Sequence, residues 1–148
     1  MNARLSLPTL VAALALGLAL PASASDAARP GPLSKEEQRL VLLDANAGED
    51  VKHVTFLRPI HGYEVVGEQN LLVWETPFKA WLLDLRESPA CRGLDREVVV
   101  ALDTLSGSLN SSNGYVRGEH GLNCKIERIR EVDVKDWKQA ERDAGIRD

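Results

Sequence analysis

Residues 71–85 read LLVWETPFKAWLLDL, and this stretch decides the fold. Two apolar, β-rich runs flank the segment TPFK, and such a short connection is typical of a β-hairpin. A four-residue loop pairs Glu75 with Ala80 and Trp74 with Trp81. In this register, one face carries Leu72, Trp74, Trp81 and Leu83. The other face carries Leu71, Val73 and Leu82, with Glu75 and Asp84 at its margins.

Both faces of this hairpin are too apolar for a sheet that has one side in water. We therefore expect each face to be covered, for example by a helix on one side and by further strands or a second helix on the other. Large aromatic side chains are more often core than surface. The alternative is that the face bearing Trp74 and Trp81 is exposed, in which case it would be a binding patch.

The flanking sequence predicts more strands and two helices. Ser34 and Glu37 match a capping box that opens a helix over residues 36–45. Asp133 caps a second helix over residues 134–144, which Gly145 ends. Short strands are expected at residues 53–57, 63–66, 98–102, 105–109, 115–117 and 124–132, the last with a bulge because its apolar residues are three apart. The fold class is α+β, with an antiparallel β-sheet, a short N-terminal helix and a C-terminal helix.

The first 24 residues have the pattern of a cleavable signal peptide. Arg4 precedes an apolar run at residues 5–20, and Pro21 is followed by Ala22-Ser23-Ala24. Small residues at these positions suit signal peptidase, so we expect cleavage between Ala24 and Ser25. The apolar run is short for a membrane span, and no basic cluster follows it. The sequence therefore predicts a periplasmic or secreted protein with no stable membrane anchor after cleavage.

Length and charge limit the class of protein. Residues 25–33 are small, polar and proline-containing, which predicts a flexible leader, and residues 34–148 have the length of a single globular domain. The whole chain has a net charge of −4 with its signs interspersed. An acidic chain of this kind has no electrostatic reason to bind a polyanion, so nucleic acid is not an expected partner.

Cys91 and Cys124 are the chain's two cysteines. In an exported protein the simplest interpretation is one disulfide. A free thiol pair and a metal site remain as alternatives. His120 stands four residues before Cys124, but one Cys–His pair with a remote cysteine is too little for a zinc site.

No catalytic motif stands out among the polar residues. The histidines His53, His61 and His120 lack ligand spacing, and no nucleophile elbow surrounds Ser106, Ser108, Ser111 or Ser112. Glu75 and Asp84 are most simply solvated acids at strand margins. The sequence thus predicts no catalytic residue, no metal and no cofactor.

Several short patterns resemble a known family. They are FLRPIHGY, LLVWETP, AWLLDL, CRGL and CKIERIREVD, spread over residues 51–138. Together they resemble an uncharacterised family of small exported proteins of Gram-negative bacteria, known as a domain of unknown function. The resemblance implies localisation in the cell envelope and the two-cysteine arrangement, and it carries no activity.

Three hypotheses for the function follow. The first is a periplasmic, non-enzymatic module that binds an envelope protein or a small ligand. The second is a structural or stress accessory protein of the envelope. The third is a hydrolase of unrecognised type, which predicts a pocket that gathers His61, Asp84 or His120.

Overall fold

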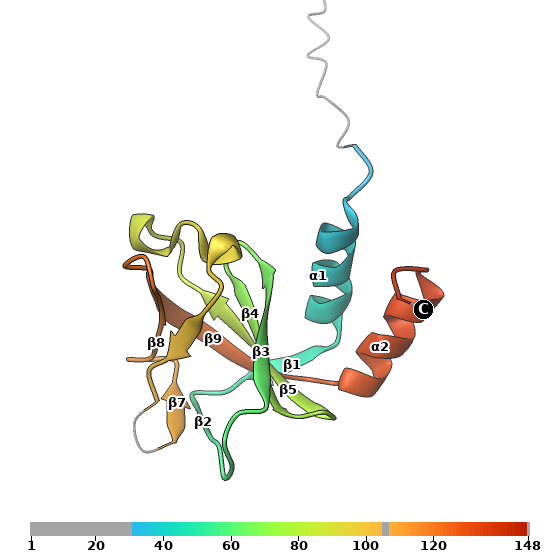
Figure 1. Cartoon of the computed structure of the whole chain (residues 1–148). Coiled ribbons are helices and arrows are strands. Elements are labelled where there is room, and N and C mark those ends of the chain that lie inside the picture. Colours follow the sequence, from blue (N-terminus) through green and yellow to red (C-terminus); the bar gives the residue numbers. More distant parts are fainter. Residues whose placement is uncertain (1–30, 105–106, 148) are drawn as a thin grey trace, which may run out of the picture. The chain divides into compact units, whose positions relative to one another are not determined.

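The 71–85 hairpin lies within an antiparallel sheet, as strands β4 (Asn70–Thr76) and β5 (Lys79–Leu85) (Figure 1). The computed structural model describes residues 31–104 and 107–147. The expected signal peptide, its cleavage site at Ala24 and Ser25, most of the leader and Ser106 lie outside these residues.

The register of the hairpin differs from the sequence-based expectation. Thr76 pairs with Lys79 across the two-residue turn at residues 77–78, and Trp74 pairs with Ala80. Glu75 is an extra residue in β4, and this bulge shifts the pairing by one position. Because side chains alternate along a strand, a one-residue shift moves Trp81 to the face opposite Trp74. The prediction that both tryptophans share a face was wrong.

The remaining strands continue the sheet on both sides of the hairpin. The order is β3-β4-β5-β9-β8-β6, β1 pairs with the far end of β9, and β2 pairs with β7 in a separate two-stranded sheet. All of these pairs are antiparallel. The bounds are β1 Ala47–Asp50, β2 His53–Thr55, β3 Gly62–Gly67, β6 Val100–Leu102, β7 Ser108–Asn110, β8 Tyr115–Gly118 and β9 Asn123–Val132. The structure therefore confirms the α+β class with an antiparallel sheet.

A bulge in β9 explains the three-residue spacing noted in its sequence. Asp84 pairs with Arg128, whereas Leu85 pairs with Ile126, so Glu127 is the extra residue. The bulge places Ile126 and Ile129 on the same face of the sheet, where both are fully buried. The predicted strand with a bulge is thus present.

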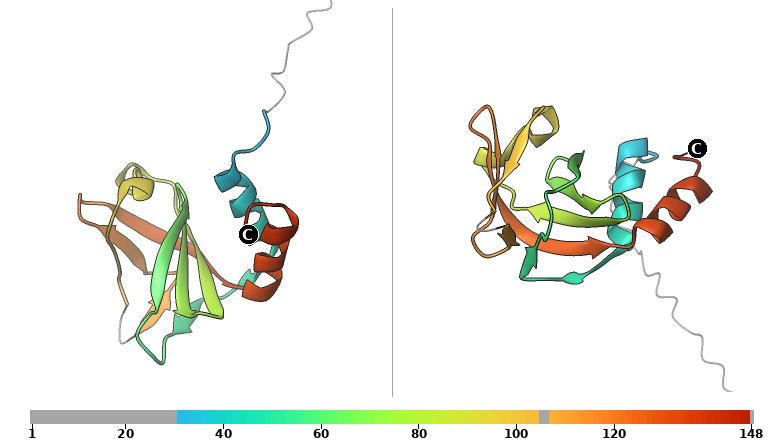
Figure 2. Two further views of the ribbon diagram at one scale, coloured as in Figure 1. Left: turned by 45° about the vertical axis from the view of Figure 1, so that its right-hand side comes forward. Right: turned by 60° about the horizontal axis from the view of Figure 1, so that its bottom comes forward.

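Two helices cover one face of the sheet (Figure 2). Helix α1 (Lys35–Ala45) begins at the expected capping box, in which the Ser34 hydroxyl accepts a hydrogen bond from the Glu37 N–H at 3.1 Å. Helix α2 (Val134–Asp143) begins at Asp133, as predicted. The core under the helices contains Leu43, Leu72, Ala80, Leu82, Val132, Val134 and Trp137.

The opposite face of the sheet is covered by the sheet itself. The strands curl around a second, larger core, with the β2–β7 pair and strands β6 and β8 facing the β4–β5 hairpin across it. Trp81 belongs to this core and is 7% exposed. The alternative of an exposed Trp74–Trp81 patch is therefore wrong for Trp81, while Trp74 is half-buried beside Trp137 on the helix face.

The structure contains elements that the sequence did not indicate. Strand β1 lies directly after α1, in a segment for which no strand was expected. Two short 3₁₀ helices, η1 (Pro89–Cys91) and η2 (Leu94–Arg96), lie in the loop after the hairpin. In α2, the charged Glu141 is buried together with Val134 and Trp137.

A Cys91–Cys124 disulfide ties η1 to the start of β9, as the sequence predicted. Cys124 is fully buried and Cys91 nearly so, within the larger core. The bond therefore holds the loop that carries both 3₁₀ helices against the sheet.

Removal of the disulfide should destabilise the fold without abolishing it. In the chain-entropy model, a bond that closes a 33-residue separation stabilises by roughly 3–4 kcal/mol. We expect the double variant C91A/C124A to lose about that much free energy of unfolding, measured by urea denaturation followed by circular dichroism. Reductant added to the native chain should lower the urea midpoint, and it should leave the midpoint of the double variant unchanged. A double variant as stable as the native chain would contradict this role.

Candidate functional site

A groove lies between α1 and the β3–β4 hairpin. Its volume is about 630 Å³. Leu40, Val65 and Val66 form its apolar part, and charged side chains surround them. The lining residues are Glu36, Glu37, Arg39, Leu40, Val65, Val66, Gly67, Glu68, Gln69, Asn70 and Asp95.

One wall of the groove is the edge of the sheet. Among the described residues, β3 is the terminal strand of the sheet and pairs with β4 alone. A two-residue turn at residues 68–69 joins the two strands, and Val66 is an extra residue in β3 next to that turn. A Cβ atom at Gly67 would come within 3.1 Å of Leu40 Cδ2, so the missing side chain lets α1 approach the strand closely.

The rim of the groove is acidic. Glu36, Glu37, Glu68 and Asp95 are all exposed. A hydrogen bond from the backbone N–H of Ser34 is the main cause that lowers the pKa of the Glu37 carboxyl, so this group is charged at neutral pH. The groove therefore presents negative charge around an apolar floor.

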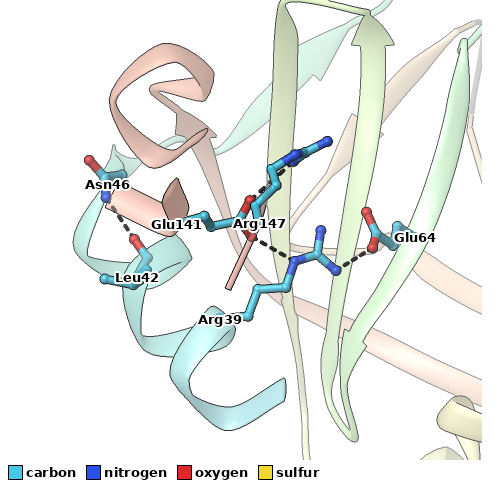
Figure 3. A network of polar contacts seen from close by, with 6 residues as sticks. All are labelled: Arg39, Leu42, Asn46, Glu64, Glu141 and Arg147. Carbon is cyan, nitrogen blue, oxygen red and sulfur yellow. Dashed lines mark hydrogen bonds and ion pairs between the residues drawn. The ribbon is translucent and has the colours of Figure 1, made fainter. Parts of the chain in front are cut away.

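Arg39 also lines the groove, but its charge is already compensated within the fold (Figure 3). Its guanidinium pairs with Glu64 of β3, and its Nε donates to Glu141 Oε1 of α2 at 2.8 Å. Arg147 donates to the other oxygen of the buried Glu141 carboxylate at 3.1 Å. The hydrogen bond to Glu64 is the main cause that raises the pKa of Arg39. This network joins α1, β3 and α2, and it leaves the rim acids without this cation.

A second hollow adjoins the groove at the turn between β3 and β4. Its volume is about 510 Å³, and it lies against the loop that carries η1 and η2. The two hollows share Glu68, Gln69 and Asp95. The second hollow is also lined by Arg92 and Arg96 beside Glu68, Glu87 and Asp95, so its charge is mixed.

A second network of charges lies beneath the helices. Arg130 Nη2 donates to Asp84 Oδ2 at 2.8 Å and to Asp44 Oδ1 at 2.6 Å. Asn70 donates to the other oxygen of Asp84 at 2.7 Å, and Arg128 approaches the carboxylate at 3.1 Å. Burial lowers the pKa of Arg130, but the hydrogen bonds and charges of the two aspartates outweigh this effect and raise it overall. Asp84 is 8% exposed, so its interpretation as a solvated acid was wrong.

The three histidines lie on separate elements. His53 is exposed on β2, and His61 is exposed just before β3. His120 is exposed in the turn between β8 and β9, and its Nδ1 lies 3.3 Å from Glu97 Oε1. None of the three lines either hollow. Neither hollow is the pocket gathering His61, Asp84 or His120 that the hydrolase hypothesis predicts.

The other polar candidates have structural contacts. The Trp81 Nε1 donates to Glu75 Oε2 at 3.0 Å. Because Trp81 belongs to the larger core, Glu75 lies on that side of the sheet, opposite the helix side that carries Asp84. The Ser108 hydroxyl bonds to Thr55 across the β2–β7 pair. Ser111 donates to the Lys52 carbonyl, and the Ser112 N–H donates to Asn110 Oδ1.

The part of the chain that the structure describes contains no group of three or more histidine, cysteine, aspartate or glutamate residues placed to hold a metal ion. Neither of its α-helices has the length and apolar character needed to cross a bilayer.

A family model matches residues 5–148, nearly the whole chain. It describes DUF6491, a family of unknown function. The chain belongs to this family. The match confirms the resemblance to a domain of unknown function. No curated protein and no solved structure matches this DUF6491 chain.

Sequence reasoning missed both the groove and the charge networks. The groove is lined from α1, from the β3–β4 hairpin and from η2, which are up to about sixty residues apart in the sequence. One signal was available for the networks. Arg39 directly precedes the apolar run of residues 40–43, and Arg130 lies two residues before the apolar Val132 in β9. Charged residues at buried positions need partners.

Proposed function

We propose that this DUF6491 protein is an exported, non-enzymatic binding module of the bacterial envelope. The observation that carries the proposal is the groove between α1 and the free edge of β3, with its apolar floor and acidic rim. A concave apolar surface with convergent polar groups is the usual form of a binding site. Several of the polar candidates, among them Glu75, Asp84 and Ser108, take part in structural contacts, which favours binding over catalysis.

Export is supported by the N-terminal sequence pattern and by the disulfide. Disulfides persist in oxidising compartments and are rare in the cytosol of most bacteria. We propose that the protein is made with a signal peptide, cleaved after Ala24, and released into the periplasm or outside the cell of a Gram-negative bacterium.

Mass spectrometry of the protein purified from an envelope fraction without reductant tests export. We expect a mass that starts at Ser25 and is lighter by two hydrogens because of the Cys91–Cys124 bond. The matched control is C91A/C124A, whose mass should equal that of its unmodified chain from Ser25. A mass that starts at Met1, or at Asn2 after removal of the initiator methionine, would contradict export.

Photocrosslinking in living cells tests the groove as the binding site. The variant Gln69→p-benzoylphenylalanine places a reactive ketone in the groove, and Asp50→p-benzoylphenylalanine places it on the exposed β1 strand. We expect a discrete crosslinked product from position 69 and none at the same mass from position 50. Equal products from both positions, or none from position 69, would argue against a binding module that uses this groove.

A further inference from the structure

We propose that the groove holds an extended, positively charged segment of a partner protein, which adds to the free edge of β3 as a short strand. The inference rests on the proposed function, because it names the ligand class of the same groove. Strand addition to an exposed sheet edge is a common mode of peptide recognition, in which the main chain contributes hydrogen bonds and the side chains contribute specificity.

The accessible part of the β3 edge is short and well defined. At one end, the Tyr63 hydroxyl accepts a hydrogen bond from the Val100 N–H at 3.0 Å, so the Tyr63 side chain ties this end of β3 to the first residue of β6. At the other end, Val65, Val66 and Gly67 line the groove between α1 and η2. A bound strand could therefore pair with about three residues of β3, which corresponds to roughly 10 Å of extended chain.

The side chains around this edge determine the charge of the ligand. Glu36 and Glu37 lie on the α1 side of the groove, Glu68 lies at the turn, and Asp95 lies on η2. Arg39 cannot neutralise them, because Glu64 and Glu141 already hold its guanidinium. Arg96 approaches Asp95 at 3.9 Å, but both side chains are exposed, so this pair offsets little of the charge. Lysine or arginine side chains on the helix side of a bound segment would place their aliphatic stems on Leu40 and their charges at the rim.

A second copy of this chain is a poor occupant of the groove. The chain has a net charge of −4, so its copies repel one another. The acidic rim adds to that repulsion at the site itself. A basic segment of another protein fits both the local and the overall charge.

Fluorescence polarisation with defined peptides tests the charge requirement. The probe is a labelled octapeptide of alternating valine and lysine, and its comparison replaces each lysine with glutamate. The test variant is E68K/D95K, and the matched control is E49K/D50K, which makes the same charge change on the exposed β1 strand. Among the described residues, none of these four acids forms an ion pair with a residue distant in the sequence. Asp95 pairs with its neighbour Arg96.

We expect the lysine peptide to bind the native chain and the glutamate peptide to fail. E68K/D95K should weaken binding of the lysine peptide by about tenfold or more, and E49K/D50K should change it by about twofold or less. Raising the salt concentration should weaken binding to the native chain. Equal binding of the two peptides, or equal effects of the two double variants, would overturn the proposal of a basic ligand.

A backbone-modified peptide tests strand addition separately. N-methylation at alternate residues keeps every lysine charge but removes the N–H groups that would donate to β3. We expect methylation of the N–H groups on one edge of the peptide to abolish binding, and methylation of the other edge to leave binding within about twofold. Undiminished binding of both methylated peptides would overturn strand addition.

The experiments distinguish failure of this inference from failure of the proposed function. A specific crosslink from position 69, without binding of the lysine peptide, would keep the binding module and reject a basic partner segment. Absence of both signals would reject the groove as a binding site altogether.

Discussion

The variant Arg130→Met should lower the free energy of unfolding by about 3 kcal/mol, because it leaves the buried carboxylate of Asp84 without its closest cation. Methionine fills much of the same space as the arginine stem, so the loss reports mainly on charge. Asn70 and the half-exposed Arg128 remain beside Asp84 and limit the effect. Urea denaturation followed by circular dichroism measures the change.

Two controls separate the buried pair from a general loss of charge. Arg128→Met removes the exposed cation from the same carboxylate and should cost about 1 kcal/mol or less. The double variant R130M/D84L replaces the pair by apolar groups and should recover most of the lost stability, since buried ion pairs are often matched by well-packed apolar residues. Additive losses in the double variant would contradict the assignment of Arg130 and Asp84 as a coupled pair.

The elements that were predicted correctly have local signals in the sequence. The capping box of Ser34 and Glu37 and the Asp133 cap each depend on residues within one helical turn, and both helices begin where expected. The bulged strand β9 was visible in the spacing of Ile126 and Ile129. The α+β class follows from these elements and from the 71–85 hairpin.

The sequence-based predictions were wrong where a single residue or a partner distant in the sequence determines the structure. A bulge at Glu75 changes a four-residue connection into a two-residue turn, and that single step moves Trp81 to the other core. A proline-containing TPFK segment permits both connections, so the sequence alone does not distinguish them.

The groove and the charge networks depend on segments far apart in the chain. Arg39, Glu64 and Glu141 come from α1, β3 and α2 and meet only after the sheet and both helices have packed. No short motif carries such a contact. The same holds for the groove, because its wall is a strand edge whose freedom from pairing is a property of the whole sheet.

Trp137→Ala should destabilise the fold by about 3–5 kcal/mol, the range typical of a large aromatic residue removed from a core. Trp137 is fully buried beneath α2, its ring lies 6.1 Å from that of Trp74, and the Arg39 guanidinium lies 5.2 Å above it. Its removal empties the centre of the core that holds both helices on the sheet. Urea denaturation followed by circular dichroism is suitable here, since it does not depend on tryptophan fluorescence.

The conservative variant Trp137→Phe should cost clearly less, about 1–2 kcal/mol, because phenylalanine keeps much of the buried area. The Trp137 Nε1 is buried without a hydrogen-bond partner in the structure, so the loss of this donor costs no hydrogen bond. A Trp137→Ala variant within about 1 kcal/mol of the native chain would contradict the packing of α2 on the sheet. Because α1 forms one wall of the groove and shares this core, Trp137→Ala should also weaken binding of the lysine peptide, whereas Trp137→Phe should preserve it.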